Sequence, residues 1–392
     1  MATSAETIRA YQGLGLFERG FRPFFFGAAA FAAVALPVWL GLLVLGWTLP
    51  TYLSARDWHV HEMIFGYIAA VLAGFLLTAI PNWTGRLPVA GRPLMLLAGL
   101  WLAGRIAMAV SAVAPVVCAA IDAGFLIALA GLAWREILAG KKIRHAPICV
   151  LLTLLALANA GFHVAALGDV DRAVAERAAL AVIAFLISLI GGRIVPSFSR
   201  NWMAQAGITA LPAPFGHVDR ASLAATGVAL IAWVSAPEHT VTATLLGVGG
   251  ILVALRLTRW RGWTTLKEPL VLILHVGYAW LPVWMVLTAA RIIWPDLIDA
   301  STALHALTAG AIATMTVAVM TRATLGHSGR PLTADRLTTA IYILVVAGAA
   351  LRILTPFLPF DYTLLLTAAG LLWSAGFALF AIGYAPIFLK AH

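Results

Sequence analysis

Charged residues are scarce in this sequence. Only 11% of the 392 residues are Asp, Glu, Lys or Arg, whereas 62% are hydrophobic. A soluble domain carries about 25% charged residues, so the composition excludes a soluble globular protein. Linker-like and low-complexity stretches are missing too, and we expect one domain over residues 1–392.

Cysteine is nearly absent as well. The two cysteines, Cys118 and Cys149, fall at opposite sides of the expected bilayer, beyond the reach of a disulfide. The sequence holds no CxxCH motif for covalent haem attachment and no CxxC pair for zinc or an iron–sulfur cluster. A haem in this protein would therefore be bound non-covalently, as a b-type haem.

A basic cluster with interleaved aromatic residues, which is typical of a nucleic-acid-binding surface, is missing despite a net charge of +10. The basic residues are spread over alternate loops instead. We therefore expect membrane lipid, and not nucleic acid, to surround this chain.

Long apolar runs are what the sequence has in abundance. They measure about 18 to 24 residues, the length that crosses a bilayer as a helix. We expect several prolines, among them Pro81 and Pro196, to mark helix ends. The sequence thus predicts an all-α integral membrane protein with twelve transmembrane helices, near 24–45, 59–80, 93–112, 114–138, 147–167, 176–195, 221–236, 240–258, 269–290, 302–321, 335–355 and 361–386.

Lys and Arg are divided unequally between the two sets of loops that these spans create. Because basic loops remain in the cytoplasm, the side that holds both termini is expected to be cytoplasmic. That side holds Arg9, Arg19, Arg22, Arg86, Arg92, Arg135, Lys141, Lys142, Arg144, Arg193, Arg200, Arg220, Arg256, Arg259, Arg261, Lys267, Arg322, Arg330, Arg336 and Lys390, and the other side holds Arg56, Arg172, Arg177, Arg291 and Arg352.

Four histidines are expected in one layer of the membrane, near its outer surface. His59 and His61 open the second span, His163 lies in the fifth and His305 in the tenth. Ionisable residues in spans are costly and usually functional, and imidazole is a common ligand of haem iron and copper. The alternative for each is an interfacial histidine bonded to a backbone carbonyl, but four in one layer favour metal binding.

The spacing of His59 and His61 suggests two different sites. On a regular helix their side chains point about 200° apart. The two would therefore serve two different sites, or one of them would be a structural group or a hydrogen-bond partner of a ligand. Glu62 follows three residues after His59 and is a candidate hydrogen-bond partner for a ligand.

Two further side chains are candidates for the same chemistry. His275, on the inner half of the ninth span, is either a metal ligand or a buried histidine bonded to a carbonyl. Arg352, at the outer end of the eleventh span, either neutralises a haem propionate or is a helix-end arginine that reaches toward the interface.

Arg105 and Asp122 are charged residues inside the third and fourth spans. Counted from the short turn between these spans, both lie about 10 Å deep. An unpaired charge at that depth would be costly, so we expect the two to pair or to share a network. A proton path is the functional alternative.

A weak internal repeat relates the second and tenth spans. The two align without gaps at a spacing of 244 residues, and this spacing of eight spans fits three four-helix units, of which the middle one matches only faintly. The informative matches pair His61, Gly66, Gly85 and Arg86 with His305, Gly310, Gly329 and Arg330.

Several motifs, in order along nearly the whole chain, resemble the NnrS family. They are WHVHEMIFG at 58–66, PNWTGR at 81–86, Gly192 and Arg193 with Pro196 and Asn201, His275 with GYAW at 277–280, HALT at 305–308, and GHSGRPL at 326–332. The resemblance implies a bacterial inner-membrane protein that carries haem and copper and takes part in denitrification and resistance to nitric oxide.

A more distant likeness is to the catalytic subunits of haem–copper oxidases and nitric oxide reductases. That fold has twelve spans in three four-helix arcs, with a low-spin haem between histidines of the second and tenth spans, where this chain has His59 and His305. The copper-binding histidines of the sixth and seventh spans have no counterpart here. A binuclear centre of the oxidase type is therefore not expected.

The leading hypothesis is a haem-containing, copper-binding oxidoreductase of the membrane that binds or consumes nitric oxide, with electrons from an unidentified donor. The proposed ligands of haem or metal are His59, His61, His163, His275 and His305, with Arg352 at the haem. We expect His305 and one of the two second-span histidines to clamp the haem iron, and His163 and the other one to bind a second metal. The first alternative is a secondary transporter, because twelve spans with internal repeats are typical of that class. The second is a nitric oxide sensor or copper-handling factor without turnover.

Overall fold

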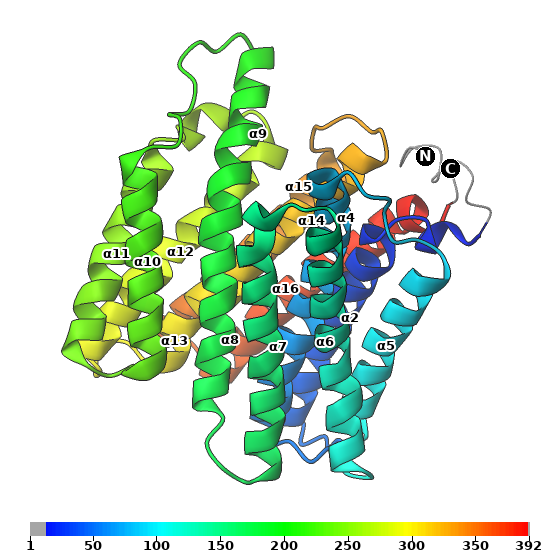
Figure 1. Ribbon diagram of the computed structural model, residues 1–392. Coiled ribbons are helices and arrows are strands. Elements are labelled where there is room, and N and C mark those ends of the chain that lie inside the picture. Colours follow the sequence, from blue (N-terminus) through cyan, green and yellow to red (C-terminus); the bar gives the residue numbers. More distant parts are fainter. Residues whose placement is uncertain (1–12, 391–392) are drawn as a thin grey trace. The chain divides into compact units, whose positions relative to one another are not determined.

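The computed structural model describes residues 13–390 of the chain (Figure 1). Within this range it holds twelve helices long and apolar enough to cross a membrane, and no strand. The predicted all-α membrane fold is therefore confirmed. Arg9, which was counted among the basic residues, lies outside the described residues.

The chain divides into two compact units, each described here by itself. Unit 1 comprises Met1–Val182 and Phe377–His392, and unit 2 comprises Ile183–Gly376. Two helices run from one unit into the other, α8 (Ala173–Leu186) and α16 (Tyr362–Leu389). The expected arrangement in three four-helix units stays a prediction.

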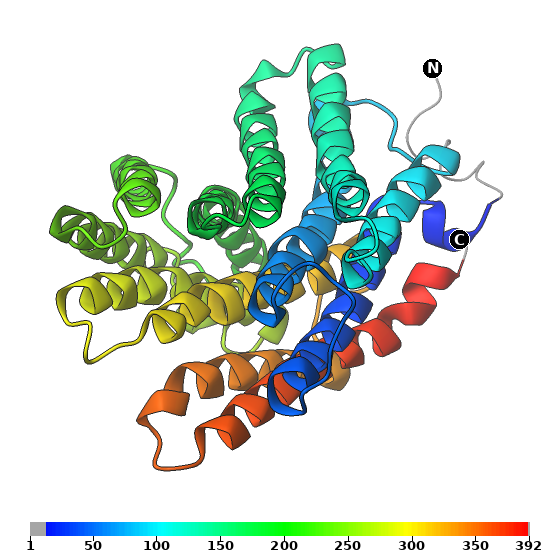
Figure 2. The same cartoon turned by 90° about the horizontal axis from the view of Figure 1, so that it is seen from below.

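Unit 1 is built from antiparallel helices with short connections. Prolines at the first turns of α5, α6 and α7 suit helix starts, where the missing N–H would have no partner. Consecutive helices α5, α6 and α7 pack side by side (Figures 1 and 2). Its elements are η1 (Gly15–Phe17), α2 (Phe21–Val44), α3 (Ala55–His61), η2 (Glu62–Ile68), α4 (Ala69–Thr84), α5 (Arg92–Ala109), α6 (Pro115–Ala139), η3 (Ile143–His145) and α7 (Ala146–Leu167).

Unit 2 is organised around α12, which contacts α11 along its length and also packs on α9, α13, α14 and α15. The helices α10, α11 and α12 lie side by side in both views (Figures 1 and 2). Its elements are η4 (Ile187–Gly191), α9 (Gly192–Gln205), α10 (His217–Ser235), α11 (Thr240–Thr258), η5 (Gly262–Thr265), α12 (Pro269–Ile293), α13 (Ala300–His305), η6 (Ala306–Ile312), α14 (Ala313–His327), α15 (Arg336–Leu354) and η7 (Thr355–Phe357).

The second and sixth spans are longer than expected. They cover Ala55–Thr84 and Ala173–Gln205, and the prediction that Pro81 and Pro196 end helices is wrong. A proline inside a helix frees the carbonyl four residues before it, which needs another donor in a membrane. For Pro196 that carbonyl belongs to Gly192, and the buried guanidinium of Arg256 donates to it at 3.5 Å.

Three spans contain a short π-helix, and two of these segments match the internal repeat. The π-helices η2 and η6 begin directly after His61 and His305 and correspond residue for residue at the spacing found in the sequence. The third, η4, lies in the sixth span. Because π-helices are rare and concentrate at functional sites, they draw attention to the two histidines that precede them.

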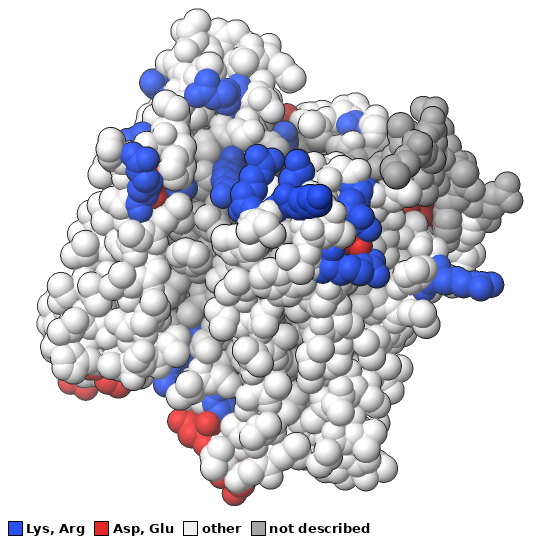
Figure 3. Space-filling model, in the orientation of Figure 1, with Lys and Arg blue, Asp and Glu red and all other residues white. Residues whose placement is uncertain are grey.

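Basic side chains gather near one end of the helices in the space-filling view, and few lie near the opposite end (Figure 3). In unit 1 the basic end carries the loops after α4 and α6, with Arg86, Lys141 and Lys142. This agrees with the unequal loop charges in the sequence. Which end faces the cytoplasm stays a prediction.

Candidate functional site

His59 and His61 have different surroundings, as their spacing on the helix predicts. The ring of His59 stacks on Trp39 of α2, with centroids 4.2 Å apart. His61 is fully buried on another side of its helix, where its Nε2 lies 3.1 Å from Asp122 Oδ2 of α6 and 3.2 Å from Asn159 Oδ1 of α7. The two histidines therefore take part in two different sets of contacts.

His163 of α7 joins His61 at the same carboxylate. Its Nε2 lies 2.9 Å from Asp122 Oδ2, and its Nδ1 lies 2.7 Å from the hydroxyl of Tyr52. The two imidazole rings are 4.8 Å apart between centroids. The structure thus brings together His163 and one second-span histidine, the pair for which a shared metal was expected.

Arg105 of α5 closes a ring of charged groups around this point. Its guanidinium donates to Glu62 Oε2 and to Asp122 Oδ1, and Glu62 Oε1 lies 2.9 Å from His61 Nδ1. The predicted pairing of Arg105 with Asp122 is confirmed. We call the seven residues the unit 1 cluster: Tyr52, His61, Glu62, Arg105, Asp122, Asn159 and His163.

The unit 1 cluster is almost closed to solvent. Six of its side chains are buried, and Tyr52 is half-buried in the loop before α3. With both carboxylates ionised, the two acids and one guanidinium carry one net negative charge, at a depth where an isolated charge is costly. A proton on a carboxylate or an imidazole, or a bound metal ion, would compensate it.

Tyr52 lies outside the spans and supports His163. Burial raises the pKa of its hydroxyl well above the usual range, with a further contribution from the Asp122 carboxylate. The hydroxyl therefore stays protonated. As a neutral phenol it can either donate to His163 Nδ1 or accept from it.

His305 ends α13 in unit 2, and its ring is oriented by a backbone carbonyl. Its Nδ1 donates to the carbonyl of Ser301 at 2.7 Å. That bond fixes the tautomer in which Nε2 carries a free lone pair, as in many metal-ligating histidines. The start of the helix is capped by Asp299, whose Oδ1 accepts from the N–H of Thr302 at 2.8 Å.

Arg352 of α15 lies beside His305 and is incompletely bonded. One of its terminal nitrogens donates to the hydroxyl of Ser301 at 2.6 Å. Its Nε and its other terminal nitrogen have no hydrogen-bond partner among residues 13–390, although the residue is only 6% exposed. The pKa of the nearby Asp299 carboxyl is lowered overall. Burial raises this pKa, but hydrogen bonds from Thr302 and, less strongly, the charge of Arg352 lower it further.

These contacts fit a haem near His305. The histidine offers an oriented nitrogen for the iron, and the incompletely bonded guanidinium of Arg352 suits a propionate. His59 and His61 belong to unit 1 and His305 belongs to unit 2. The expected haem ligation by one of the former with the latter stays a prediction.

His275 is held as a buried hydrogen-bonded histidine. Its Nε2 lies 2.7 Å from the hydroxyl of Ser199, and its Nδ1 faces Gly262, where an added Cβ would lie 2.6 Å away. Within the described range, the one group of three potential metal ligands is His61, Asp122 and His163. His275 makes the kind of hydrogen bond expected of the non-metal alternative, with a serine hydroxyl in place of a carbonyl, and its role as a ligand stays a prediction.

Sequence reasoning missed part of the cluster. Asp122 was expected to pair with Arg105 but was not considered as a ligand, and Asn159 and Tyr52 were not singled out. Asn159 lies four residues before His163, so the shared helix face was a usable signal. Tyr52 lies in a loop, where helical periodicity gives no information.

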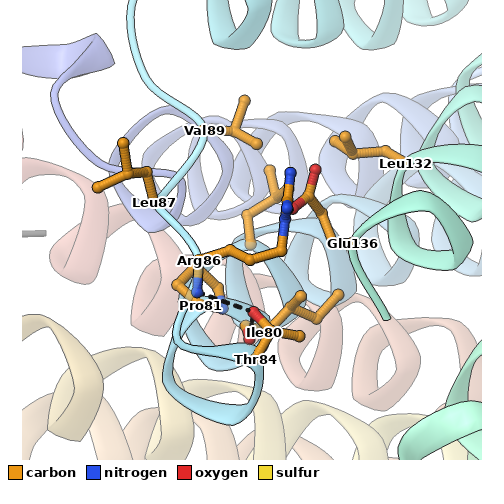
Figure 4. A pocket seen from close by; sticks show the side chains of 9 residues that line it. Ile80, Pro81, Thr84, Arg86, Leu87, Val89, Leu132 and Glu136 are labelled. Atoms are coloured by element: carbon orange, nitrogen blue, oxygen red, sulfur yellow. Dashed lines mark hydrogen bonds and ion pairs between the residues drawn. The ribbon is translucent and has the colours of Figure 1, made fainter. Parts of the chain in front are cut away.

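A small pocket lies elsewhere in unit 1, beside the end of α4 (Figure 4). It has room for little more than one water molecule. Arg86 and Glu136 form an ion pair at its edge. It is lined by Leu77, Ile80, Pro81, Thr84, Arg86, Leu87, Val89, Leu132 and Glu136, which supply no metal-binding group of three.

Comparison with known proteins agrees with the motifs in the sequence. A family model described as NnrS protein matches residues 15–392. No curated protein matches the chain. Because the match covers nearly the whole chain, this multi-pass membrane protein belongs to the NnrS family.

Proposed function

We propose that this protein is a haem-containing redox protein of the bacterial inner membrane that binds or consumes nitric oxide in denitrification and nitrosative-stress defence. Membership in the NnrS family supports a role in the nitric oxide response. The observation that carries the haem assignment is the arrangement of His305 and Arg352 around Ser301.

The residues of unit 2 have separate tasks in this proposal. The Ser301 carbonyl holds the proton of His305 on Nδ1, so that Nε2 is available to the iron at all times. Arg352 binds a propionate with the two nitrogens that have no other partner among residues 13–390. A bound haem would supply a site for nitric oxide or for electron transfer.

The second axial ligand is expected to be His59 or His61. With two imidazoles on the iron the haem would be low-spin and suited to electron transfer. Nitric oxide chemistry would then need a displaced histidine or a separate metal. Since His61 already takes part in the unit 1 cluster, we expect His59→Ala to lower haem content more than His61→Ala.

The experiment is the absorbance of the Soret band per protein after purification in detergent. We expect a red wild-type protein, almost no haem in His305→Ala and a partial loss in Arg352→Gln. His217→Ala is the matched control, because His217 is exposed at the start of α10. Full occupancy in His305→Ala would refute the site.

A colourless wild-type protein, after expression with ample haem, would favour the transporter hypothesis instead. For a red protein, a nitric oxide electrode separates binding from consumption. Consumption continues with turnover when a chemical reductant is supplied, whereas binding stops at about one equivalent. Either result supports a protein that acts on nitric oxide. A spectrum that stays unchanged when nitric oxide is added would contradict this function.

A further inference from the structure

We propose that His61, Asp122 and His163 of unit 1 bind one redox-active transition metal ion, iron or copper, separately from any haem. The three ligand atoms all lie within 4.8 Å of one another. The Nε2 atoms of the two histidines lie 3.1 and 2.9 Å from Asp122 Oδ2. Ligand atoms around a tetrahedral ion with bonds near 2.05 Å are about 3.3 Å apart, so a small shift of these side chains suffices.

Both histidines are held in the orientation that a metal site needs. Glu62 Oε1 contacts Nδ1 of His61 at 2.9 Å, and the Tyr52 hydroxyl contacts Nδ1 of His163 at 2.7 Å. Each imidazole therefore presents its Nε2 to the same point. A carboxylate or another polar group behind a ligating histidine is the usual arrangement around protein-bound metals.

Asp122 is crowded in a way that a metal ion would relieve. Its Oδ2 is approached by His163 Nε2 and Asn159 Nδ2, each at 2.9 Å, and by His61 Nε2 at 3.1 Å. Its other oxygen is held by Arg105. An ion between the two imidazoles and Oδ2 replaces two of these contacts by metal–ligand bonds and leaves Asn159 as a hydrogen-bond donor.

The charge of the cluster also favours a cation. When both are ionised, Glu62 and Asp122 carry two negative charges, and Arg105 offsets one of them. The other groups of the cluster are Asn159 and His163 on α7 and Tyr52 in the loop before α3, and they are neutral when His163 is unprotonated. A divalent ion changes the sum from one negative to one positive charge, whereas a proton on His61 brings it to zero. The charge of the cluster therefore suits either a further proton or a metal ion, and the ligand geometry is what selects a metal.

The donor set narrows the class of ion. Two imidazoles and one carboxylate are the ligands of many non-haem iron(II) sites and also suit copper(II), and no sulfur atom belongs to the group. Three protein ligands leave at least one position for water or a small molecule. The site is thus suited to a ligand as small as a diatomic gas.

The test is metal analysis of the full-length protein, purified in detergent and dialysed against a chelator to remove loosely bound ions. We expect the wild type to retain about one equivalent of iron or copper beyond its haem iron. His163→Ala should lose this metal and keep its Soret band. His305→Ala should lose haem and keep the metal, so failure of one site is distinguishable from failure of the other.

Two controls make the outcome decisive. His217→Ala, on the surface of unit 2, should retain both cofactors. His163→Gln keeps a polar side chain of similar length, so it is expected to disturb the fold less than His163→Ala. Elution volume and helical content show whether each variant is folded when its metal is missing. A wild type with no metal beyond haem iron that also fails to take up Fe²⁺ or Cu²⁺ would overturn the proposal. So would unchanged metal content in both His163 variants, and the cluster would then be an ion-pair network closed by a proton.

Discussion

Glu62 is the residue on which two separate contacts of the unit 1 cluster depend. One of its oxygens faces His61 Nδ1 and the other accepts from Arg105. Its charge makes His61 a better electron donor and holds Arg105 in place. A neutral amide at this position would keep the shape of the side chain and lose both effects.

We therefore predict that Glu62→Gln weakens metal binding roughly 10- to 100-fold, the usual effect of losing the partner of a ligating histidine. Competition between the protein and a coloured chelator gives the affinity. Glu238→Gln is the control, because Glu238 pairs with Arg291 in an exposed position. Equal affinity in Glu62→Gln and the wild type would show that Glu62 does not support a ligand.

For single residues, the sequence predicted the depth at which each one lies in the membrane. It placed His163 in one layer with His59 and His61, and Arg105 with Asp122, because these residues lie at similar distances from helix ends. It did not reveal that Glu62 bridges His61 and Arg105, since that depends on side-chain rotamers. Nor did it indicate Tyr52, whose position is set by the path of a loop.

The π-helices are the elements that distinguish the second and tenth spans from ordinary transmembrane helices. Each follows its histidine and contains a glycine at which another side chain packs closely. A Cβ on Gly310 would lie 2.7 Å from the indole of Trp280, closer than van der Waals contact allows. The absence of a side chain at Gly310 thus allows η6 to approach α12.

Gly310→Ala should destabilise the protein by about 1–3 kcal/mol, the usual cost of an overpacked core. Because η6 begins directly after His305, haem content should fall as well. Gly99→Ala is the matched control, since Gly99 is exposed on α5 and has nothing within 4 Å of an added Cβ. Thermal unfolding in detergent measures the difference, and equal midpoints for the two variants would contradict the packing argument.

Helix positions were predictable from apolar runs, but the π-helices and the helical prolines were not. A π-helix has the same hydrophobic content as an α-helix, and only the paired glycines at the repeat spacing hinted at it. Pro196 remains inside a helix because Arg256, distant in sequence, donates to the Gly192 carbonyl and to the Ser188 carbonyl at 3.0 Å. Such compensation is not encoded locally.

At the scale of the whole molecule, the unequal numbers of Lys and Arg in the two sets of loops predict how the chain lies across the membrane. Lys142 is in the basic loop before α7, and Val170 is in the loop after it. Basic loops resist translocation, so position 142 is expected in the cytoplasm and position 170 outside. One transmembrane helix, α7, separates them.

Cysteine labelling of intact cells tests this orientation. In a background without Cys118 and Cys149, a membrane-impermeant maleimide should label Val170→Cys at once and Lys142→Cys only after the cells are opened. Val170 is 58% exposed, so the reagent can reach it. The opposite pattern would invert the topology, and equal labelling of both positions in intact cells would contradict a span between them.

The ring formed by Glu62, Arg105 and Asp122 limits how the newly made chain can enter the bilayer. These residues belong to three successive helices that leave the ribosome one after another. An unpaired charge inside a span raises the cost of insertion, up to about 2.5–3.5 kcal/mol at a helix centre, and pairing lowers that cost. We therefore expect the second, third and fourth spans to partition into lipid as a group once Asp122 has been made.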